Sequence, residues 1–167
     1  QMPQYAWGYK NDQPIRVSAG MLDAEAYGVK SSSSDMLKFL DIQIHPQKLK
    51  QPLRAAVETT HVGYFKVGAM TQGLGWEQYA YPVQLETLLQ GNSSKMALES
   101  HAATPIKQPK RAPAATLFNK TGSSNGFGAY AAFIPQQEIG IVMLTNTNFP
   151  NDARITASYH VMQQLLQ

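Results

Sequence analysis

The sequence predicts an α+β protein built on an antiparallel meander of three strands with flanking helices. Three apolar segments, 115–120, 128–134 and 139–144, are separated by connections that are short enough for hairpins. A segment after them, 151–166, has apolar residues at intervals of three and four, which is typical of an amphipathic helix. Such a helix would pack across the meander and produce the layers of the α+β class.

Length and composition are those of an ordinary globular chain. It has 167 residues, of which 43% are hydrophobic and 15% charged, and it contains no cysteine. These values are typical of one domain large enough to bury its own core. The absence of cysteine excludes disulfide frameworks, thiolate zinc sites and cysteine nucleophiles.

Neither nucleic acid nor a membrane is an expected partner. The local excess of positive charge at Lys107, Lys110 and Arg111 is interrupted by prolines and lacks the interleaved aromatic residues of a nucleic-acid surface. The longest apolar runs, such as 139–144, are far shorter than the roughly 20 residues that span a bilayer. The first residues lack a basic segment followed by an apolar one, so we expect no signal peptide within this chain.

The first third of the chain predicts a long packed loop followed by two helices. Residues 1–31 are rich in aromatic residues, glycine and proline but have no regular period. Serines 32–34 followed by Asp35 are typical of a helix start, and Pro46 would end that helix. Its apolar face would comprise Met36, Leu37, Leu40 and Ile44. The second helix would begin at Pro52 and bury Leu53, Ala56, Val57 and Thr60.

The middle of the chain predicts short strands and one short helix. Segments 64–67 and 74–79 are aromatic and punctuated by glycine, which favours strands, and a helix follows around 83–89. Residues 91–113 are polar and irregular. The third meander strand is apolar almost throughout, as expected of a strand covered on both faces. Asn151 or Asp152 would cap the final helix.

Three overlapping motifs lie between residues 119 and 131. The pattern Gly126-x-Gly128-x-x-Ala131 resembles a dinucleotide fingerprint, and Gly122-x-Ser124-x-Gly126 resembles the nucleophile elbow of α/β-hydrolases. Both motifs require a helix after the glycines, whereas the sequence here predicts a strand. An α/β-hydrolase that uses Ser124 therefore remains a weaker alternative, and it predicts helix after Gly126.

The third motif, Lys120-Thr121-Gly122, has a plausible chemical role at the end of a strand. A lysine beside a cleft supplies a fixed cation that lowers the pKa of a nearby nucleophile or base and attracts an anionic substrate. The Thr121 hydroxyl can bind a carboxylate or relay a proton, and Gly122 allows a ligand to approach the backbone. The amide of Ser123 could then donate to a developing oxyanion. On the tripeptide alone, a surface Lys-Thr before a turn glycine explains the pattern about as well.

Three further residues are candidate ligand groups. Asn151 and Arg154 lie three apart, so both could project from one face of the last helix toward a carboxylate, although capping and surface pairing explain them more simply. Tyr27 could form the wall of a ligand site, and a buried loop tyrosine is the alternative. The four histidines lack metal-ligand spacing, so we expect no metal.

Several blocks of the sequence together resemble the class C serine β-lactamases, the cephalosporinases. The resemblance covers the chain from end to end, in the same order, and is far more specific than Lys-Thr-Gly alone. The blocks are 5–9 (YAWGY), 22–30 (LDAEAYGVK), 72–77 (QGLGWE), 119–128 (NKTGSSNGFG) and 140–146 (GIVMLTN).

The resemblance implies roles for six residues. Lys120 and Thr121 would line the β-lactam site, and the amide of Ser123 would form part of the oxyanion hole. Tyr27 would flank the substrate side chain, and Asn151 and Arg154 would lie near the substrate carboxylate. Some members of the family have histidine at the position of Asn119, whose side chain would point away from the cleft.

The nucleophile of the family is missing from these residues. It belongs to a Ser-x-x-Lys motif, and no lysine here has a serine three positions before it. The Tyr-x-Asn match at Tyr9 falls inside the block 5–9, which in the family follows the catalytic Tyr-x-Asn, so we do not assign that role to Tyr9. The chain therefore resembles the C-terminal part of a single β-lactamase-like domain of the serine β-lactamase and penicillin-binding transpeptidase fold. Its parts would be a long active-site loop (1–31), a helical and short-strand region (32–113) and the meander with its C-terminal helix (114–167).

The resemblance implies a monomeric periplasmic parent protein that hydrolyses β-lactams, preferentially cephalosporins, through a serine acyl-enzyme and without metal or cofactor. The chain alone would be inactive and would need the missing N-terminal part as its partner. Two alternatives remain, a penicillin-binding carboxypeptidase or esterase of the same fold and a non-catalytic ligand-binding domain. A chain that lacks its packing partner should also be less stable, and more prone to stick, than its composition suggests.

Overall fold

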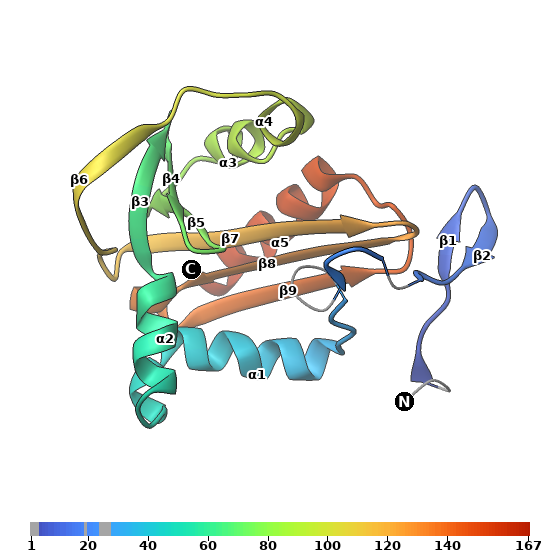
Figure 1. Ribbon diagram of the computed structural model, residues 1–167, viewed down its shortest axis with the longest axis horizontal. Helices are drawn as coiled ribbons and strands as arrows, with labels where there is room; N and C mark the ends of the chain where they lie inside the picture. The colour runs from blue at the N-terminus through green and yellow to red at the C-terminus, as the bar shows by residue number, and fades with distance from the viewer. Residues whose placement is uncertain (1–3, 19, 24–27) are drawn as a thin grey trace.

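An antiparallel sheet of seven strands forms the centre of the computed structural model, which describes residues 4–18, 20–23 and 28–167 (Figure 1). The strands lie side by side in the order β6-β3-β4-β5-β7-β8-β9. In chain order they are β3 (Val62–Val67), β4 (Met70–Gly73), β5 (Glu77–Ala80), β6 (Thr104–Arg111), β7 (Thr116–Ser124), β8 (Phe127–Ile134) and β9 (Ile139–Thr145). The predicted α+β class and its three-stranded meander, β7-β8-β9, are both confirmed.

Helices surround this sheet, and a separate hairpin lies at one end of it (Figure 1). The helices are α1 (Ser33–Ile44), α2 (Leu53–Thr60), α3 (Leu85–Gly91), α4 (Ser94–Leu98) and α5 (Asn151–Leu165), with single 3₁₀ turns at η3 (Pro46–Lys48) and η4 (Pro135–Gln137). The hairpin consists of β1 (Gly8–Lys10) and β2 (Gln13–Ile15). None of the helices in the described part of the chain has the length and apolar character needed to cross a membrane.

Strand β8 divides the core into two layers. Successive side chains of a strand point to opposite faces of the sheet. The layer on one face joins Tyr130, Ala132 and Ile134 to Ile155 and Met162 of α5. The layer on the other face joins Ala131 and Phe133 to Leu40 of α1. Helices α1 and α5 therefore cover opposite faces of the meander.

The turn between β7 and β8 is tighter than the sequence indicated. We expected residues 122–126 to form the connection, but pairing continues to Ser124 and Phe127, so the turn consists of Asn125 and Gly126. Gly126 has a φ of 78°, in the left-handed region that glycine adopts without the steric cost of a Cβ atom. Lys120, Thr121 and Gly122 consequently lie within a strand.

The segment after Gly126 is a strand, β8, and not a helix. A dinucleotide fingerprint needs a helix N-terminus at this point, and a nucleophile elbow needs a strand-to-helix turn. Both of those interpretations are therefore excluded, including the hydrolase alternative that uses Ser124.

Strand β9 is contacted by a helix on each face, as its apolar sequence predicted, but it lies at the edge of the sheet. It is the last strand of the sheet, and all its residues are at least partly exposed, Leu144 at 42%. Helices α1 and α5 each contact it from one face, but no further strand lies beside it among the described residues. Its apolar sequence therefore borders solvent along one edge.

Residues 91–113 are more regular than predicted. They contain α4 and the eight-residue strand β6, which pairs with β3 alone at the opposite edge of the sheet. The prolines at 105 and 109 concealed this strand, because proline removes a ladder donor and argues against a central strand. An edge strand tolerates proline, since one side of its backbone faces solvent.

Part of the predicted loop at 1–31 forms the β1–β2 hairpin. The prediction missed it because each strand has only three residues and shows no alternation. The hairpin docks on the end of the meander, where the amide of Tyr9 donates to the carbonyl of Asn146 at 2.8 Å and the Asn146 side chain donates to the carbonyl of Trp7 at 3.1 Å. Arg16 lies over the ring of Trp7, 4.3 Å from its centroid.

The predictions for the two helices near the start of the chain differ in accuracy. Helix α1 is confirmed, and the Ser32 hydroxyl caps it by accepting from the amide of Asp35, but Leu37, which we expected on its apolar face, is 51% exposed. Helix α2 exists, but Leu53 is 64% exposed and Ala56 is also exposed, so their predicted burial is wrong. Val57 and Thr60, on the same face, are half-buried. The cap of α5 is Pro150, without a side-chain hydrogen bond, rather than Asn151 or Asp152.

A buried histidine links α1 to the sheet. His61 follows α2 and is 1% exposed, and its ring contacts the rings of both Phe118 and Phe133. Its Nε2–H donates to Oε1 of Gln43 at 3.0 Å, and the same oxygen accepts from the indole of Trp76 at 3.2 Å. Burial lowers the pKa of His61 to about 4, with a smaller contribution from the nearby Arg111 and an opposing one from Glu58.

Because His61 is buried in its neutral form, we expect the protein to lose stability in mild acid. Because the pKa of His61 is lower when folded than the ordinary value of 6.5, the unfolded chain binds a proton that the folded chain does not. The stabilisation is complete above the unfolded value and is lost as the pH falls toward the folded one. From about pH 7 to about pH 5 this contribution falls by on the order of 2 kcal/mol.

Urea denaturation across that pH range measures the effect. A His61→Gln variant should lose most of this pH dependence, whereas His160→Gln should keep it, because His160 is exposed on α5. Equal pH dependence in all three proteins would contradict the assignment to His61.

Candidate active site

The second half of β7 has a free edge. Strand β5 pairs with β7 from Thr116 only as far as Asn119, opposite Glu77. Residues 120–124 therefore pair with β8 on one side and, within the described part of the chain, have no strand on the other. Backbone groups on such an edge remain available to a ligand, as in peptide recognition by strand addition. This geometry places Lys120, Thr121 and the amide of Ser123 along one accessible strand.

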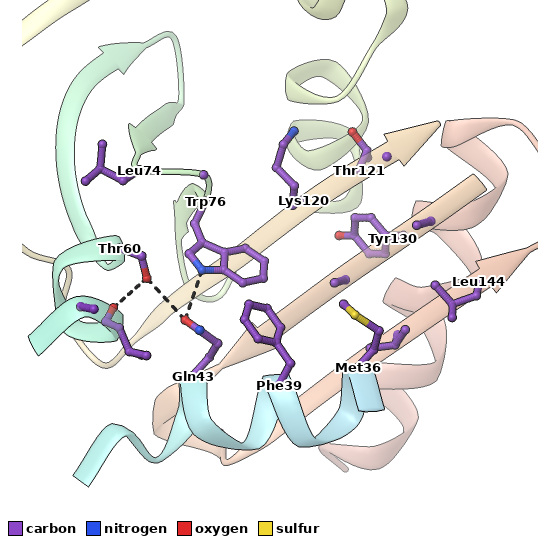
Figure 2. Close-up of a pocket in the computed structure, with 17 residues that line it drawn as sticks. Met36, Phe39, Gln43, Thr60, Leu74, Trp76, Lys120, Thr121, Tyr130 and Leu144 are labelled. Atoms are coloured by element: carbon purple, nitrogen blue, oxygen red, sulfur yellow. Dashed lines mark hydrogen bonds between the residues drawn. The ribbon is translucent and has the colours of Figure 1, made fainter. Parts of the chain in front are cut away.

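An apolar cavity of about 530 Å³ lies beside this strand (Figure 2). Lys120 and Thr121 stand on its β7 side, and Met36, Phe39 and Gln43 of α1 form the opposite wall. The rest of its lining comes from α2, the segment 74–76, Gly122 of β7, and strands β8 and β9. Ala56, Val57 and Thr60 of α2 thus belong to the same cavity.

Lys120 is held by an acidic partner. Its Nζ lies 2.8 Å from Oε1 of Glu77, and the lysine side chain is 49% exposed while Glu77 is largely buried. The other oxygen of Glu77 accepts from the side chain of Asn119 at 3.3 Å, and that same amide donates to Oδ1 of Asn92 at 2.9 Å. The buried network anchors the carboxylate, which in turn restrains the cation at the cavity.

Sequence reasoning did not identify Glu77. It lies within the block 72–77 that carries the family resemblance, but nothing local to it indicates a partner 43 residues away. The pairing of β5 with β7 places it opposite Asn119. The expectation that Asn119 points away from the cleft agrees with its complete burial.

Three other candidate residues line a second cavity of about 500 Å³, between the start of α5, the end of β7 and the segment 89–94. They are Ser123, Asn151 and Arg154. The candidate residues therefore border two cavities, with the end of β7 contributing to both. Tyr27 lies outside the described residues.

Arg154 is 1% exposed, and burial holds the pKa of its guanidinium below the usual value. Its Nη1 donates to the carbonyls of Gly122 at 2.7 Å and Ala129 at 2.6 Å. Its Nη2 donates to the hydroxyl of Ser123 at 2.9 Å and to the side-chain oxygen of Asn151. The guanidinium is thus directed into the protein, toward β7 and β8.

The arrangement supplies binding and electrostatic groups rather than a nucleophile. A fixed cation, a hydroxyl and free backbone donors can stabilise negative charge that develops on a bound carbonyl. Among the described residues, no three histidine, aspartate, glutamate or cysteine side chains lie close enough together to hold a metal ion.

Comparison with known proteins agrees with this architecture. A protein-family model described as Beta-lactamase matches residues 1–166, and the chain belongs to that family. A relative from Pseudomonas fluorescens, named Beta-lactamase, is 48% identical over 168 residues, covering 100% of this chain and 47% of the relative. The chain thus spans about half the length of the curated relatives that it matches.

Solved structures give the same result. The crystal structure of a β-lactamase/D-alanine carboxypeptidase from Pseudomonas syringae is similar with a TM-score of 0.93 and 48% identity, covering 97% of this chain and 46% of that one. A class C β-lactamase structure is similar with a TM-score of 0.90 and 47% identity, covering 98% of this chain and 45% of that one. The predicted resemblance to the C-terminal part of class C enzymes is confirmed.

Proposed function

We propose that this chain is the C-terminal part of a class C serine β-lactamase, and we refer to that longer protein as the parent protein. The observation that carries the proposal is the free edge of β7, along which Lys120, Thr121 and Ser123 lie while Glu77 restrains the lysine. The parent protein would be a periplasmic monomer that acts without metal or cofactor and prefers cephalosporins. The blocks that resemble cephalosporinases support that preference.

In the proposed reaction, a serine from the upstream part attacks the lactam carbonyl. The C–N bond of the ring breaks, the serine proton reaches the ring nitrogen, and water then hydrolyses the acyl-enzyme to release the opened product. The Ser123 amide donates to the oxyanion, and Lys120 provides positive charge beside it. The Thr121 hydroxyl and Asn151 bind the polar groups of the substrate, and Tyr27 flanks its side chain.

A second candidate function is D-alanine carboxypeptidase activity. The Pseudomonas syringae protein of known structure is named for that activity as well as for β-lactamase activity, and both reactions proceed through a serine acyl-enzyme. The two differ in how fast water removes the acyl group. Pre-steady-state kinetics of the parent protein would separate them, because a carboxypeptidase would remain acylated by a cephalosporin for far longer than one turnover of a β-lactamase.

A chimaera tests the proposal without knowledge of the upstream sequence. These 167 residues would replace the matching segment of the Pseudomonas fluorescens relative, to which they are 48% identical. We expect the chimaera to hydrolyse a chromogenic cephalosporin, and a Lys120→Ala version to lose most of that activity. A folded chimaera without turnover would refute the assignment to a β-lactamase.

The isolated chain should be inactive and should self-associate. It lacks a Ser-x-x-Lys nucleophile, and it exposes apolar residues such as Leu53 on α2, Leu74 in the apolar cavity and Leu144 on β9. Exposed apolar patches and unpaired strand edges promote association. Sedimentation velocity and a chromogenic cephalosporin assay would check both points. A monomer with a cooperative thermal unfolding transition, or with turnover that depends on Lys120, would contradict the expectation.

A further inference from the structure

The hydrogen bonds of Arg154 occupy every terminal N–H of its guanidinium. An arginine has five N–H donors, of which four lie on its two terminal nitrogens. Here those four reach four oxygens, belonging to Gly122, Ala129, Ser123 and Asn151. The fifth, on Nε, is buried without a partner in the structure. Because burial also keeps Nε–H from a ligand, a substrate carboxylate could gain a bond from Arg154 only if one of the four other bonds broke.

The neighbouring backbone leaves space for the guanidinium. A Cβ atom at Gly128 would lie 2.9 Å from Nη1 of Arg154 and 3.0 Å from Cζ. It would also lie 2.7 Å from the hydroxyl of Thr145 on β9. Glycine at this position of β8 thus allows the arginine to approach the two strands closely. Packing and hydrogen bonding independently indicate one inward position for this side chain.

We propose that Arg154 is a positioning residue that joins α5 to the ends of β7 and β8, and that it does not bind the substrate carboxylate. This inference rests on the proposed function, because the segment that Arg154 holds carries the Ser123 amide. Bonds to the carbonyl of Gly122 and the hydroxyl of Ser123 fix the peptide between these residues. The direction of the Ser123 N–H, on which oxyanion binding depends, is set by that peptide.

The same bonds orient Asn151. Because its side-chain oxygen accepts from Arg154, its Nδ2 group is directed away from the guanidinium. Asn151 borders the second cavity, so this amide is the group that can donate to a substrate carboxylate there. Removing Arg154 and removing Asn151 should therefore have different effects on catalysis.

A pair of substrates separates the two roles. The parent protein would be assayed with a cephalosporin and with the methyl ester of its carboxylate. Arg154→Ala should lower kcat by about tenfold or more on both substrates, because a displacement of about 1 Å in a catalytic group can cost about 100-fold. Asn151→Ala should raise KM for the acid alone. Loss by Arg154→Ala on the acid but not on the ester, or on neither, would overturn the proposal.

A second variant keeps the arginine and displaces it. Gly128→Ala should reproduce the kcat loss of Arg154→Ala on both substrates, and full activity in Gly128→Ala would overturn the proposal. Arg54→Ala is the matched control, since Arg54 is partly exposed and pairs with Glu58 on the surface of α2. It should retain kcat and KM within about twofold.

Amide hydrogen exchange gives a readout that does not depend on activity. In Arg154→Ala, and in Gly128→Ala if the former does not fold, exchange should accelerate at residues 121–124 and remain unchanged in β3. An equal increase in both strands would mean general destabilisation and would contradict the proposal. Absence of all turnover in the unsubstituted parent protein would refute the proposed function, and the exchange result would still decide the role of Arg154.

Discussion

Replacing Lys120 by alanine in the parent protein should lower kcat/KM for a cephalosporin by about 100- to 1,000-fold. Loss of one preorganised electrostatic group at a developing oxyanion typically has an effect of that size. The position of this cation is set by Glu77 at 2.8 Å, so its charge is already beside the free edge of β7 before substrate binds. Steady-state kinetics with a chromogenic cephalosporin would measure the change.

Lys38→Ala provides the control for that experiment. Lys38 pairs with Asp35 at 2.9 Å on the exposed side of α1, and its side chain is 79% exposed. Its removal should change kcat/KM by less than about twofold, since exposed ion pairs contribute little. Comparable losses in both variants, or no loss in Lys120→Ala, would show that Lys120 does not take part in the reaction.

Phe133→Ala should lower the free energy of unfolding by about 3–5 kcal/mol, the usual cost of deleting a fully buried aromatic side chain. Phe133 is 0% exposed and stacks on Phe118, with ring centroids 4.7 Å apart. The indole of Trp76 meets it edge-on at 5.0 Å. The substitution would open a cavity between β8 and α1 that these rigid rings cannot fill. Urea denaturation of the parent protein would measure the loss.

Phe65→Ala is the matched comparison, because Phe65 lies on β3 and is 44% exposed. It should cost less than about 1 kcal/mol. A similar cost at both positions would contradict the view that the layer between β8 and α1 is a principal part of the core.

The meander could be predicted because its signals are local. Each strand contains an apolar run, and the connections between the strands are short and rich in turn residues, although the exact turn at Asn125 and Gly126 was not predicted. Strand β6 could not be predicted in the same way, since its prolines are acceptable only at an edge, and edge position depends on the whole sheet. The exposure of Leu53 on α2 also depends on what lies across from the helix rather than on its period.

The candidate site was partly predictable for the same reason. Lys120, Thr121 and Ser123 are consecutive or nearly so, and a short motif brings them to attention. Glu77 enters through strand register, and Arg154 turns inward because of oxygens on β7 and β8 and the space at Gly128. Contacts between distant segments of this kind leave no periodic or compositional signal in one sequence.

The alternation along β8 has a consequence for how the sequence can change over time. Residues 130, 132 and 134 share their neighbours with α5, whereas residues 131 and 133 share theirs with α1. A change of volume at one position is most readily compensated by a residue that it touches. Substitutions on β8 should therefore fall into two independent groups, one correlated with substitutions on α5 and the other with substitutions on α1. The residues of the two groups nevertheless alternate along the chain.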